Sequence, residues 1–514
     1  MELDFDPAPR LSLYGYSPET PESILARIAS GARPSSLKGD FVLVAEGQEA
    51  RTGRPLMVFI SSLIAAVPHY IARAGAHWVH ASTVFECCQK AGLPWRWNWD
   101  ALAQLVLFEH VLGNASLHAD IERVPARSVL RLCGAKRDVV TEAFWSELHA
   151  ERRLRALPTD AAEVLLEVLG ELPALNRYSL SLSAGYDSRL LLAGLTRLRR
   201  EVTTACMGSP GATDPRIAAQ LAQAMGCRFQ RVEIEPADYL RHADDIVRTT
   251  SGEKIFWHWH TAIYSRKVGF DSQTTHLAGS NGEFVRSYFF DKGMAAELLD
   301  LCGYSRWDRW LSLKNASRRR VAPAVRRALD PFSPFARALN ARRQLEESFL
   351  RMRFGDGLDY FYAAERVRNF IGLGLALYRG SFPTMSPFLD ARFIRVAAQL
   401  TRHNKLADRT PRALIAKLQP SLLEFPADDS GRPMGQQPAA FFFLRKPTSH
   451  AYQRHREAHD LPEVAEWARD GFEVLNGEAP GSGTELDAEV HHWDHAITVG
   501  ATARMIRTLG IPLG

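Results

Sequence analysis

The sequence contains little cysteine and no long apolar run. Six of its 514 residues are cysteines and none of them forms a CxxC pair, so a disulfide framework and a zinc knuckle are both disfavoured. No run of about 18 apolar residues is present, and the first residues lack the basic and apolar regions of a signal peptide. We therefore expect a cytoplasmic protein with neither a membrane span nor a secretion signal.

Lysine is scarce, and no charge sign dominates. The 63 Lys and Arg residues against 58 Asp and Glu residues give a net charge of +5, which is too mild for a dedicated nucleic-acid-binding protein. Only ten of the basic residues are lysines, so a lysine needed for chemistry has few candidates. The hydrophobic content of 46% is ordinary for a globular chain, and the length allows about two to four domains.

The sequence pattern changes near residue 150. Before it, short apolar runs predict strands at 41–47, 55–62 and 128–134, and residues 100–113 have helical spacing. The polar segment 151–160 marks the expected boundary between two domains, 1–150 and 151–514.

From about residue 175, predicted strands and helices alternate. The strands are 178–183, 202–208 and 229–235, and the helices between them are 189–198 and 215–226. This order is typical of a βαβαβ unit with a parallel sheet. Beyond about residue 300 the pattern is mostly helical.

The most informative segment is the loop LSAGYDSR at 182–189, between a predicted strand and a predicted helix. Open α/β sheets bind ligands at this edge. The small residues Ser183, Ala184 and Gly185 let backbone N–H groups approach a phosphate, and the helix N-terminus favours an anion. Asp187 supplies a carboxylate for a phosphate-bound Mg²⁺. The alternative is an ordinary turn with Asp or Ser as the helix cap.

This loop resembles the S-G-G-x-D-S motif of ATP pyrophosphatases, with Ala184 in place of the first glycine. Two later segments resemble those of the asparagine synthetase family, in the same order. HLAGSNGEFVRSYFF (276–290) is similar to S-G-E-G-S-D-E-x-F-G-G-Y, and SPFLDARFIRVAAQL (386–400) is similar to V-P-F-L-D-x-x-x-x-x-x-A. With the tail of the first domain (107–132), the resemblance covers about residues 40–425.

The resemblance implies an α/β protein of two parts. The first is a degenerate Ntn-type, glutaminase-like α+β domain; the second is an ATP-pyrophosphatase domain of the adenine nucleotide alpha hydrolase-like kind, with a parallel sheet and a helical C-terminal part. It implies ATP and Mg²⁺ as cofactors, with Asp187 and Glu283 holding the metal. The residues implied to contact ATP and pyrophosphate are Ser183, Ala184, Gly185, Tyr186, Asp187, Ser188, Met207 and Gly279.

The glutaminase nucleophile of that family is missing. Asparagine synthetases carry a cysteine directly after the initiator Met, where this sequence has Glu2. Cys87 and Cys88 lie on an apolar helical stretch, and we expect both to pack in a core. The resemblance then implies a glutamine-independent amide ligase, which adenylates a carboxylate with release of pyrophosphate and joins it to an amine.

Two family branches lack this cysteine, the β-lactam synthetases and the lasso-peptide macrolactam synthetases. The β-lactam branch has a Glu four residues before its P-F-L-D segment, whereas Pro383 stands here. We therefore predict a lasso cyclase that closes a macrolactam ring on a precursor peptide. Its implied partners are that peptide, a leader-peptide protease and a leader-binding protein, with neither nucleic acid nor membrane.

Other interpretations stay open. Lys446 is the predicted catalytic cation and Arg432 its rival, while Arg189 could reach a phosphate or lie on a helix surface.

The protein could instead be an amidotransferase-like synthetase of a polysaccharide or natural-product cluster, or a non-catalytic scaffold. Residues 257–260 suggest a strand face lining a core or pocket. The last histidines, 491, 492 and 495, are either a metal clamp or a solvated helix end.

Overall fold

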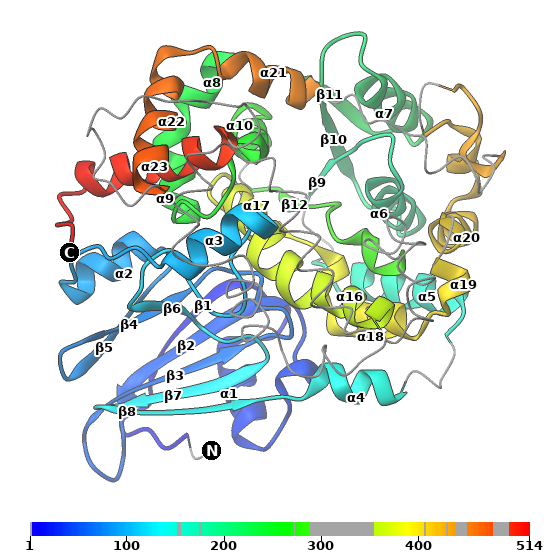
Figure 1. Ribbon diagram of the computed structural model, residues 1–514. Coiled ribbons are helices and arrows are strands. Elements are labelled where there is room, and N and C mark those ends of the chain that lie inside the picture. Colours follow the sequence, from blue (N-terminus) through cyan, green and yellow to red (C-terminus); the bar gives the residue numbers. More distant parts are fainter. Residues whose placement is uncertain are drawn as a thin grey trace.

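The computed structural model describes residues 3–151, 156–173, 177–271, 273–286, 354–405, 408–427, 430–436, 450–475 and 493–514. The protein is mixed α/β, with antiparallel sheets in the N-terminal half and a parallel sheet later in the chain (Figure 1). Within these ranges, no helix is long and apolar enough to cross a membrane.

Two antiparallel sheets pack face to face in the N-terminal half. The five-stranded sheet has the order β1 (Arg10–Tyr16), β2 (Asp40–Gln48), β3 (Pro55–Ser61), β7 (Ser128–Cys133) and β8 (Lys136–Thr141). The three-stranded sheet has the order β5 (His77–Ala81), β4 (Tyr70–Ala74) and β6 (Ile121–Arg123). The strands predicted at 41–47, 55–62 and 128–134 are confirmed as β2, β3 and β7.

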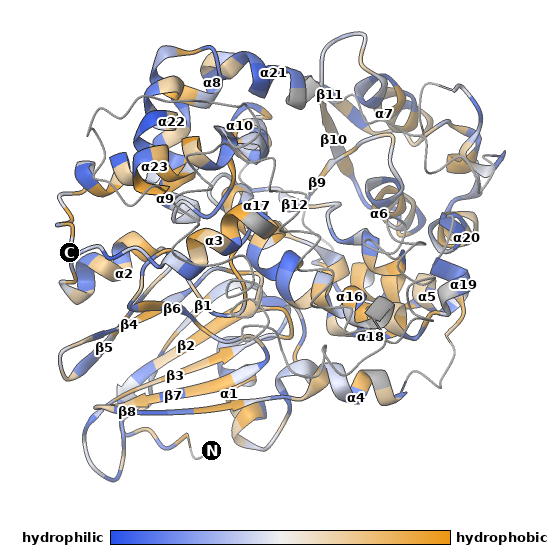
Figure 2. Ribbon diagram, in the orientation of Figure 1, coloured by the Kyte–Doolittle hydropathy of each residue, from blue (hydrophilic) through white to orange (hydrophobic). Residues whose placement is uncertain are grey.

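The sheet is covered on both faces, and this explains the continuous apolar run in β2. Val42 and Val44 face the three-stranded sheet, whereas Leu43 packs against Ile24 and Ile28 of helix α1. Alternate residues of a strand point to opposite faces, so a strand buried on both sides needs apolar residues at every position. Figure 2 shows the mostly hydrophobic colouring of β2, β3 and β7. The helices of this half are α1 (Pro21–Ala29), η1 (Pro34–Ser36), α2 (Val84–Ala91), α3 (Trp99–Phe108) and α4 (Phe144–Glu151).

The second half contains the predicted βαβαβ unit. Its parallel sheet has the order β11 (Arg228–Val232), β10 (Val202–Met207), β9 (Tyr178–Ser181), β12 (Thr275–Leu277) and β13 (Thr384–Met385). Helix α6 (Tyr186–Arg197) follows β9 and α7 (Thr213–Ala224) follows β10. Because α6 begins three residues earlier than predicted, Asp187 and Ser188 belong to its first turn.

The remaining described part of the chain is mostly helical. It contains α5 (Pro158–Gly170), α8 (Pro236–Arg241), α9 (Ala243–Thr250), η2 (Phe256–His258), α10 (His260–Lys267), η3 (Gly282–Val285), α16 (Phe354–Phe361), the π-helix η5 (Tyr362–Ile371), α17 (Gly372–Arg379), η6 (Pro387–Leu389), α18 (Ala391–Gln399), α19 (Arg402–Lys405), α20 (Arg409–Leu418), η8 (Pro420–Glu424), η9 (Met434–Gln436), α21 (His450–Ala458), α22 (Pro462–Leu475) and α23 (Trp493–Thr508).

Two local predictions are wrong. The helix predicted over 100–113 ends at Phe108, because Glu109 adopts the left-handed conformation with φ of 68°. Residues 257–260 form no strand; they join the 3-10 helix η2 to α10. The alternating histidines in this segment resemble a strand pattern, but four residues are too few to fix the periodicity.

The two halves share their hydrophobic cores and a buried polar junction. Arg123, which is 2% exposed, donates to Arg368 O at 3.0 Å, to Asn369 Oδ1 at 2.9 Å and to Ala65 O at 3.0 Å. At the chain's end, Trp95 N donates to Pro512 O at 2.6 Å, and Figure 1 shows that end beside α2. The predicted boundary at residue 150 stays a prediction, since apolar residues on both of its sides pack into common clusters.

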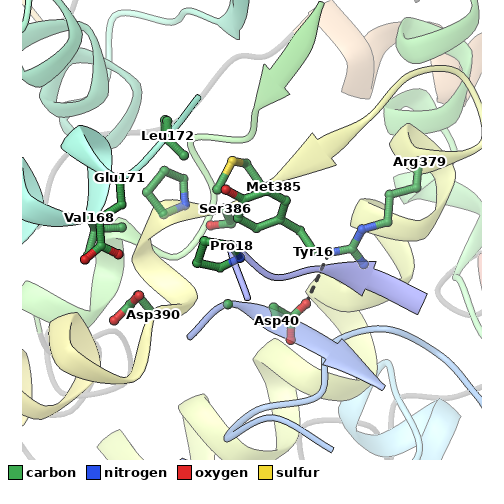
Figure 3. A pocket seen from close by; sticks show the side chains of 12 residues that line it. Tyr16, Pro18, Asp40, Val168, Glu171, Leu172, Arg379, Met385, Ser386 and Asp390 are labelled. Carbon is green, nitrogen blue, oxygen red and sulfur yellow. Dashed lines mark hydrogen bonds and ion pairs between the residues drawn. The ribbon is translucent and has the colours of Figure 1, made fainter. Parts of the chain in front are cut away.

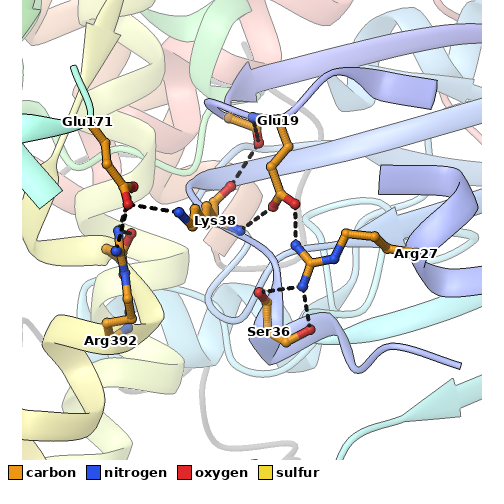
Figure 4. Close-up of polar contacts among 8 residues, drawn as sticks. Glu19, Arg27, Ser36, Lys38, Glu171 and Arg392 are labelled. Atoms are coloured by element: carbon orange, nitrogen blue, oxygen red, sulfur yellow. Dashed lines mark hydrogen bonds and ion pairs between the residues drawn. The ribbon is translucent and has the colours of Figure 1, made fainter. Parts of the chain in front are cut away.

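A second polar contact joins the first strands to the C-terminal half. Arg379 donates to Asp40 Oδ2 at 3.1 Å, beside a cavity of only about 20 Å³ (Figure 3). Nearby, Glu171 accepts from Lys38 Nζ at 2.7 Å and from Arg392 Nη2 at 2.8 Å (Figure 4). These contacts fix the orientation of β1 and β2 relative to α5 and α18.

Replacing Arg123 by Met should destabilise the protein by about 3–5 kcal/mol, because three buried acceptors lose their donor. The urea unfolding midpoint measures this loss. Arg73→Met is the matched control, since Arg73 is an exposed arginine on the neighbouring strand β4. A loss no larger than that of the control would contradict the assigned role of the junction.

Candidate functional site

A cavity of about 530 Å³ lies at the carboxyl ends of β9 and β12. Its walls come from the loop after β9, the loop after β12, the segment around η2, and the π-helix with α17. The labels β9, β12, α6 and α17 mark its position in Figure 1. The volume is typical of a small-molecule site, and the position is the one at which parallel sheets bind ligands.

The loop after β9 is closed by its own hydroxyl groups. Ser183 N donates to Ser188 Oγ at 3.0 Å, and Gly185 N donates to Ser183 Oγ at 3.2 Å. Gly185 is the N-cap of α6, and no side chain caps that end. The first N–H groups of a helix lack intrahelical partners, so this end of α6 favours an anion in the cavity.

Most of the predicted nucleotide contacts lie on this cavity. The nucleotide contacts concerned are Ser183, Gly185, Tyr186, Asp187, Ser188 and Gly279, and Glu283, predicted as a metal ligand, lines the cavity too. Ala184 and Met207 are not among the lining residues. Ala184 is 2% exposed and its N–H donates to Asp214 Oδ1 at 3.0 Å, while Met207 ends β10 and packs against a hydrophobic cluster.

Three carboxylates surround one guanidinium in the cavity. Arg286 Nη2 lies 2.7 Å from both oxygens of Asp187, and its Nη1 lies 3.7 Å from Asp408 Oδ1. Glu283 Oε2 accepts from Tyr362 Oη at 3.1 Å. Burial raises the pKa of Asp187 to about 7; Arg286 opposes this shift, and the charges of Glu283 and Asp408 reinforce it. The negative charges of Asp187, Glu283 and Asp408 therefore outnumber the one positive charge of Arg286 in this cluster.

These residues provide the oxygen ligands that Mg²⁺ prefers. The buried Oδ1 atoms of Asn281 and Asp408 form no hydrogen bond within the described ranges, so each could accept from a further donor or bind a cation. Both residues are non-glycine residues with positive φ, at 80° and 54°. Such backbone strain concentrates at functional sites. Asp187, Glu283 and Asp408 offer oxygen ligands of the right chemistry for magnesium, although their carboxylates do not converge within 4.8 Å of one another in this arrangement.

Asp408 was missed by the sequence interpretation, because it directly precedes α20 and reads as an ordinary helix cap. Its side chain reaches the cavity only because α20 packs against α5 and α6. No local signal distinguishes this aspartate from a capping residue.

Lys254 and His258 form another wall of the cavity. Lys254 Nζ donates to Phe370 O at 3.0 Å and lies 3.9 Å from the centroid of the Phe370 ring. No carboxylate of the described residues lies within ion-pair distance of it. Burial lowers the pKa of Lys254 to about 7; the charge of Arg366 adds to the shift and that of Glu109 opposes it. A lysine in this state can exchange a proton near neutral pH.

His258 is neutral for the same reason, since burial lowers its pKa well below the usual range. Its Nε2 has no hydrogen-bond partner among the residues that the structure describes. The prediction that residues 257–260 line a core or pocket is confirmed by His258, whereas the sequence signal for Lys254 is only the scarcity of lysine, which makes each of the ten lysines a candidate. Only the fold identifies Lys254 as one that lines the cavity.

The other candidates from the sequence either lie outside the described residues or do not line the cavity. Lys446 and the histidines at 491 and 492 lie outside the described residues, whereas Arg432 is exposed. Arg189 is neither a phosphate ligand nor a surface arginine: it is fully buried, and it donates to Leu422 O at 2.9 Å and Pro426 O at 2.7 Å. It joins the start of α6 to the segment after α20.

The cysteines of the N-terminal half are core residues, as expected. Cys87 and Cys88 are fully buried, and burial raises the pKa of their thiols to about 12 and about 11. Neither can form the thiolate that a glutaminase needs at neutral pH.

Neither a protein-family model nor a curated protein matches this sequence. The resemblance to the asparagine synthetase family therefore stays a prediction, and the geometry of the cavity must support any functional assignment.

Replacing Gly282 by Ala should distort the carboxylate cluster. A Cβ atom at this position would lie 2.5 Å from Asp187 Cγ, so one of the two loops must move, at a cost of about 1–3 kcal/mol. Thermal unfolding measures the loss. Gly170→Ala is the control, because a Cβ at Gly170, the last residue of α5, meets nothing within 4 Å. Equal stability of the two variants would contradict the close approach of Gly282 to the side chain of Asp187.

Proposed function

We propose that this protein is an ATP-dependent amide ligase of the asparagine synthetase-like kind, which adenylates a carboxylate and transfers the acyl group to an amine. The observation that carries the proposal is the cavity itself. It combines a helix N-terminus without a side-chain cap, three carboxylates around one guanidinium and a buried lysine whose pKa is lowered to about 7. These are the parts that phosphate binding, metal binding and proton transfer require.

The first half-reaction uses the loop side of the cavity. The N-terminus of α6 and the hydroxyls of Ser183 and Ser188 bind the phosphates of ATP. A substrate carboxylate oxygen attacks the α-phosphorus, and the bond to the β-phosphate breaks with pyrophosphate leaving. Asp187, Glu283 and Asp408 would hold a magnesium ion, which would stabilise the charge of the leaving group when bound. Arg286 exchanges its ion pair with Asp187 for contact with phosphate oxygens.

The second half-reaction uses the lysine wall. The amine nitrogen attacks the acyl carbon, the carbon–oxygen bond to AMP breaks, and AMP leaves with the electron pair. The amine proton passes to the neutral form of Lys254, which lines the cavity and, among the described residues, has no carboxylate partner to keep it charged. General-base transfer of this kind contributes about 10²–10⁴-fold to a rate. Lys446 stays the predicted cation that would stabilise charge on the acyl-adenylate, a role separate from that of the base Lys254.

The specific substrate that we propose is a precursor peptide, whose N-terminal amine closes a macrolactam ring on an Asp or Glu side chain. A peptide that is already folded makes the second step unimolecular, which can lower the barrier by about 7–11 kcal/mol at best. The proposed partners are a leader-binding protein and a leader-peptide protease in the cytoplasm. The buried thiols of Cys87 and Cys88 support an amine source other than glutamine.

ATP–pyrophosphate exchange with candidate peptides tests the first half-reaction. Asp187→Asn should lower the exchange rate about 10²–10³-fold, because the neutral amide cannot replace a charged ligand at the leaving group. Asp244→Asn is the control, since Asp244 lies exposed on α9. Unchanged exchange in Asp187→Asn would rule out the proposed nucleotide site, and exchange with a free amino acid but no peptide would favour the alternative amidotransferase-like synthetase.

Single-turnover ring closure tests the second half-reaction. Lys254→Met should keep ATP–pyrophosphate exchange within a few-fold and slow amide formation about 10²–10⁴-fold. The base is the deprotonated amine, so the wild-type rate should rise with pH through about 7, and Lys254→Met should lose this rise. Lys90→Met, at an exposed lysine of α2, is the control. If both half-reactions slow equally, Lys254 does not act as the base.

A further inference from the structure

Two histidines and an aspartate meet outside the cavity. His455 belongs to α21, His459 follows that helix directly, and Asp494 lies in the first turn of α23. His459 Nε2 lies 2.9 Å from Asp494 Oδ1, and His455 Nε2 lies 3.9 Å from Asp494 Oδ2. We call these three residues the His–His–Asp cluster. Figure 1 shows α21 and α23 in the helical group beside α8 and α10.

The two histidines are four residues apart, so they share one face of the chain as α21 ends. Their rings lie 5.4 Å apart and nearly perpendicular, with Asp494 presenting one oxygen to each. The sequence suggests either a metal clamp or a solvated helix end at a different histidine, His495. That residue lies buried on α23, and the described residues that converge come from two different helices.

The donor atoms have the separation that a metal site needs. One ligand atom from each residue lies within 4.8 Å of the others, so an ion at their centre would be at most about 2.8 Å from each. Zinc sites have distances of about 2.0–2.2 Å for nitrogen and oxygen ligands, so only a small contraction is required. Two imidazole nitrogens and a carboxylate oxygen are a zinc-type donor set that leaves the fourth position for water.

The surroundings restrict water and hold the rings in place. The ring of Phe256 lies 5.6 Å from that of His459, Trp257 lies 6.3 Å from His455, and Trp493 lies 6.4 Å from His459. The side chains of His455, His459 and Asp494 are 7%, 19% and 27% exposed. An aromatic, half-buried position strengthens the attraction between a cation and its ligands.

We propose that the His–His–Asp cluster binds a divalent transition metal of the zinc class, which fastens α21 to α23 against η2. The proposal does not depend on the amide-ligase function. Its structural consequence is local to the cavity wall: Phe256 and Trp257 belong to η2, and His258, the next residue, lines the cavity. A metal here would fix this wall from behind without contacting the substrate.

The competing explanation is a hydrogen-bond clasp, in which Asp494 simply accepts from His459. Asp494→Asn separates the two explanations. The amide oxygen still accepts a hydrogen bond from the imidazole, so a clasp is retained, but the neutral amide is a poor ligand for a divalent ion.

The experiment uses the full chain, stripped with a chelator and titrated with Co²⁺ and with Zn²⁺. We expect one Co²⁺ per chain with the visible absorption of four-coordinate cobalt, and a higher thermal unfolding temperature with Zn²⁺. His459→Gln and Asp494→Asn should each weaken binding at least about tenfold and lose the thermal shift. His77→Gln, at an exposed histidine of β5, is the control and should bind as the wild type does.

Three outcomes would overturn the proposal. These are Co²⁺ binding that does not saturate, a thermal shift with Zn²⁺ that survives in Asp494→Asn, and wild-type stability that Zn²⁺ leaves unchanged. If His459→Gln fails to fold, the Asp494→Asn titration alone decides, because that substitution preserves size and hydrogen bonding.

Discussion

The structure depends on the buried polar junction at the π-helix η5. Arg368 on this helix donates to Val124 O at 2.7 Å, and Glu365 accepts from Gly113 N at 2.7 Å. Both partners belong to the N-terminal half, more than 200 residues away in sequence. Buried charges are tolerated only when hydrogen-bonded, so the two halves have one favourable orientation rather than a range of them. The same helix ends in Phe370 and Ile371, which line the cavity.

The N-terminal half therefore contributes to the site even though its cysteines are buried and inert. Glu253 accepts from Leu117 N at 3.2 Å and from Tyr70 Oη at 3.2 Å, so the residue before Lys254 is held by two segments of that half. Burial raises the pKa of Glu253 to about 7, with Arg123 opposing the shift. The N-terminal half thus supports the segment that places Lys254 on the cavity wall.

The opposite walls of the cavity have complementary electrostatics. Around Arg286, carboxylates outnumber the cation, whereas the wall at Lys254 contains basic side chains of lowered pKa and no ion pair among the described residues. In the proposed reaction, the first side would bind the phosphates and the second would accept the proton of the amine. The His–His–Asp cluster lies behind this second wall. It connects α21 with α23, and its histidine rings contact Phe256 and Trp257 of η2, the 3-10 helix that also contains His258.

The sequence alone determined the features that depend on neighbouring residues. Apolar runs and alternating elements predicted β2, β3, β7 and the βαβαβ unit, and small residues before a helix placed the loop with Asp187 at a sheet edge, because these signals act over a few residues. Tertiary structure alone decided which distant groups meet. No local pattern singles out Lys254 or Asp408, and Arg189 reads as either a phosphate contact or a helix-surface residue. Each acquired its environment from segments far along the chain, and burial, which changes a pKa and selects a partner, is a property of packing that no local pattern records.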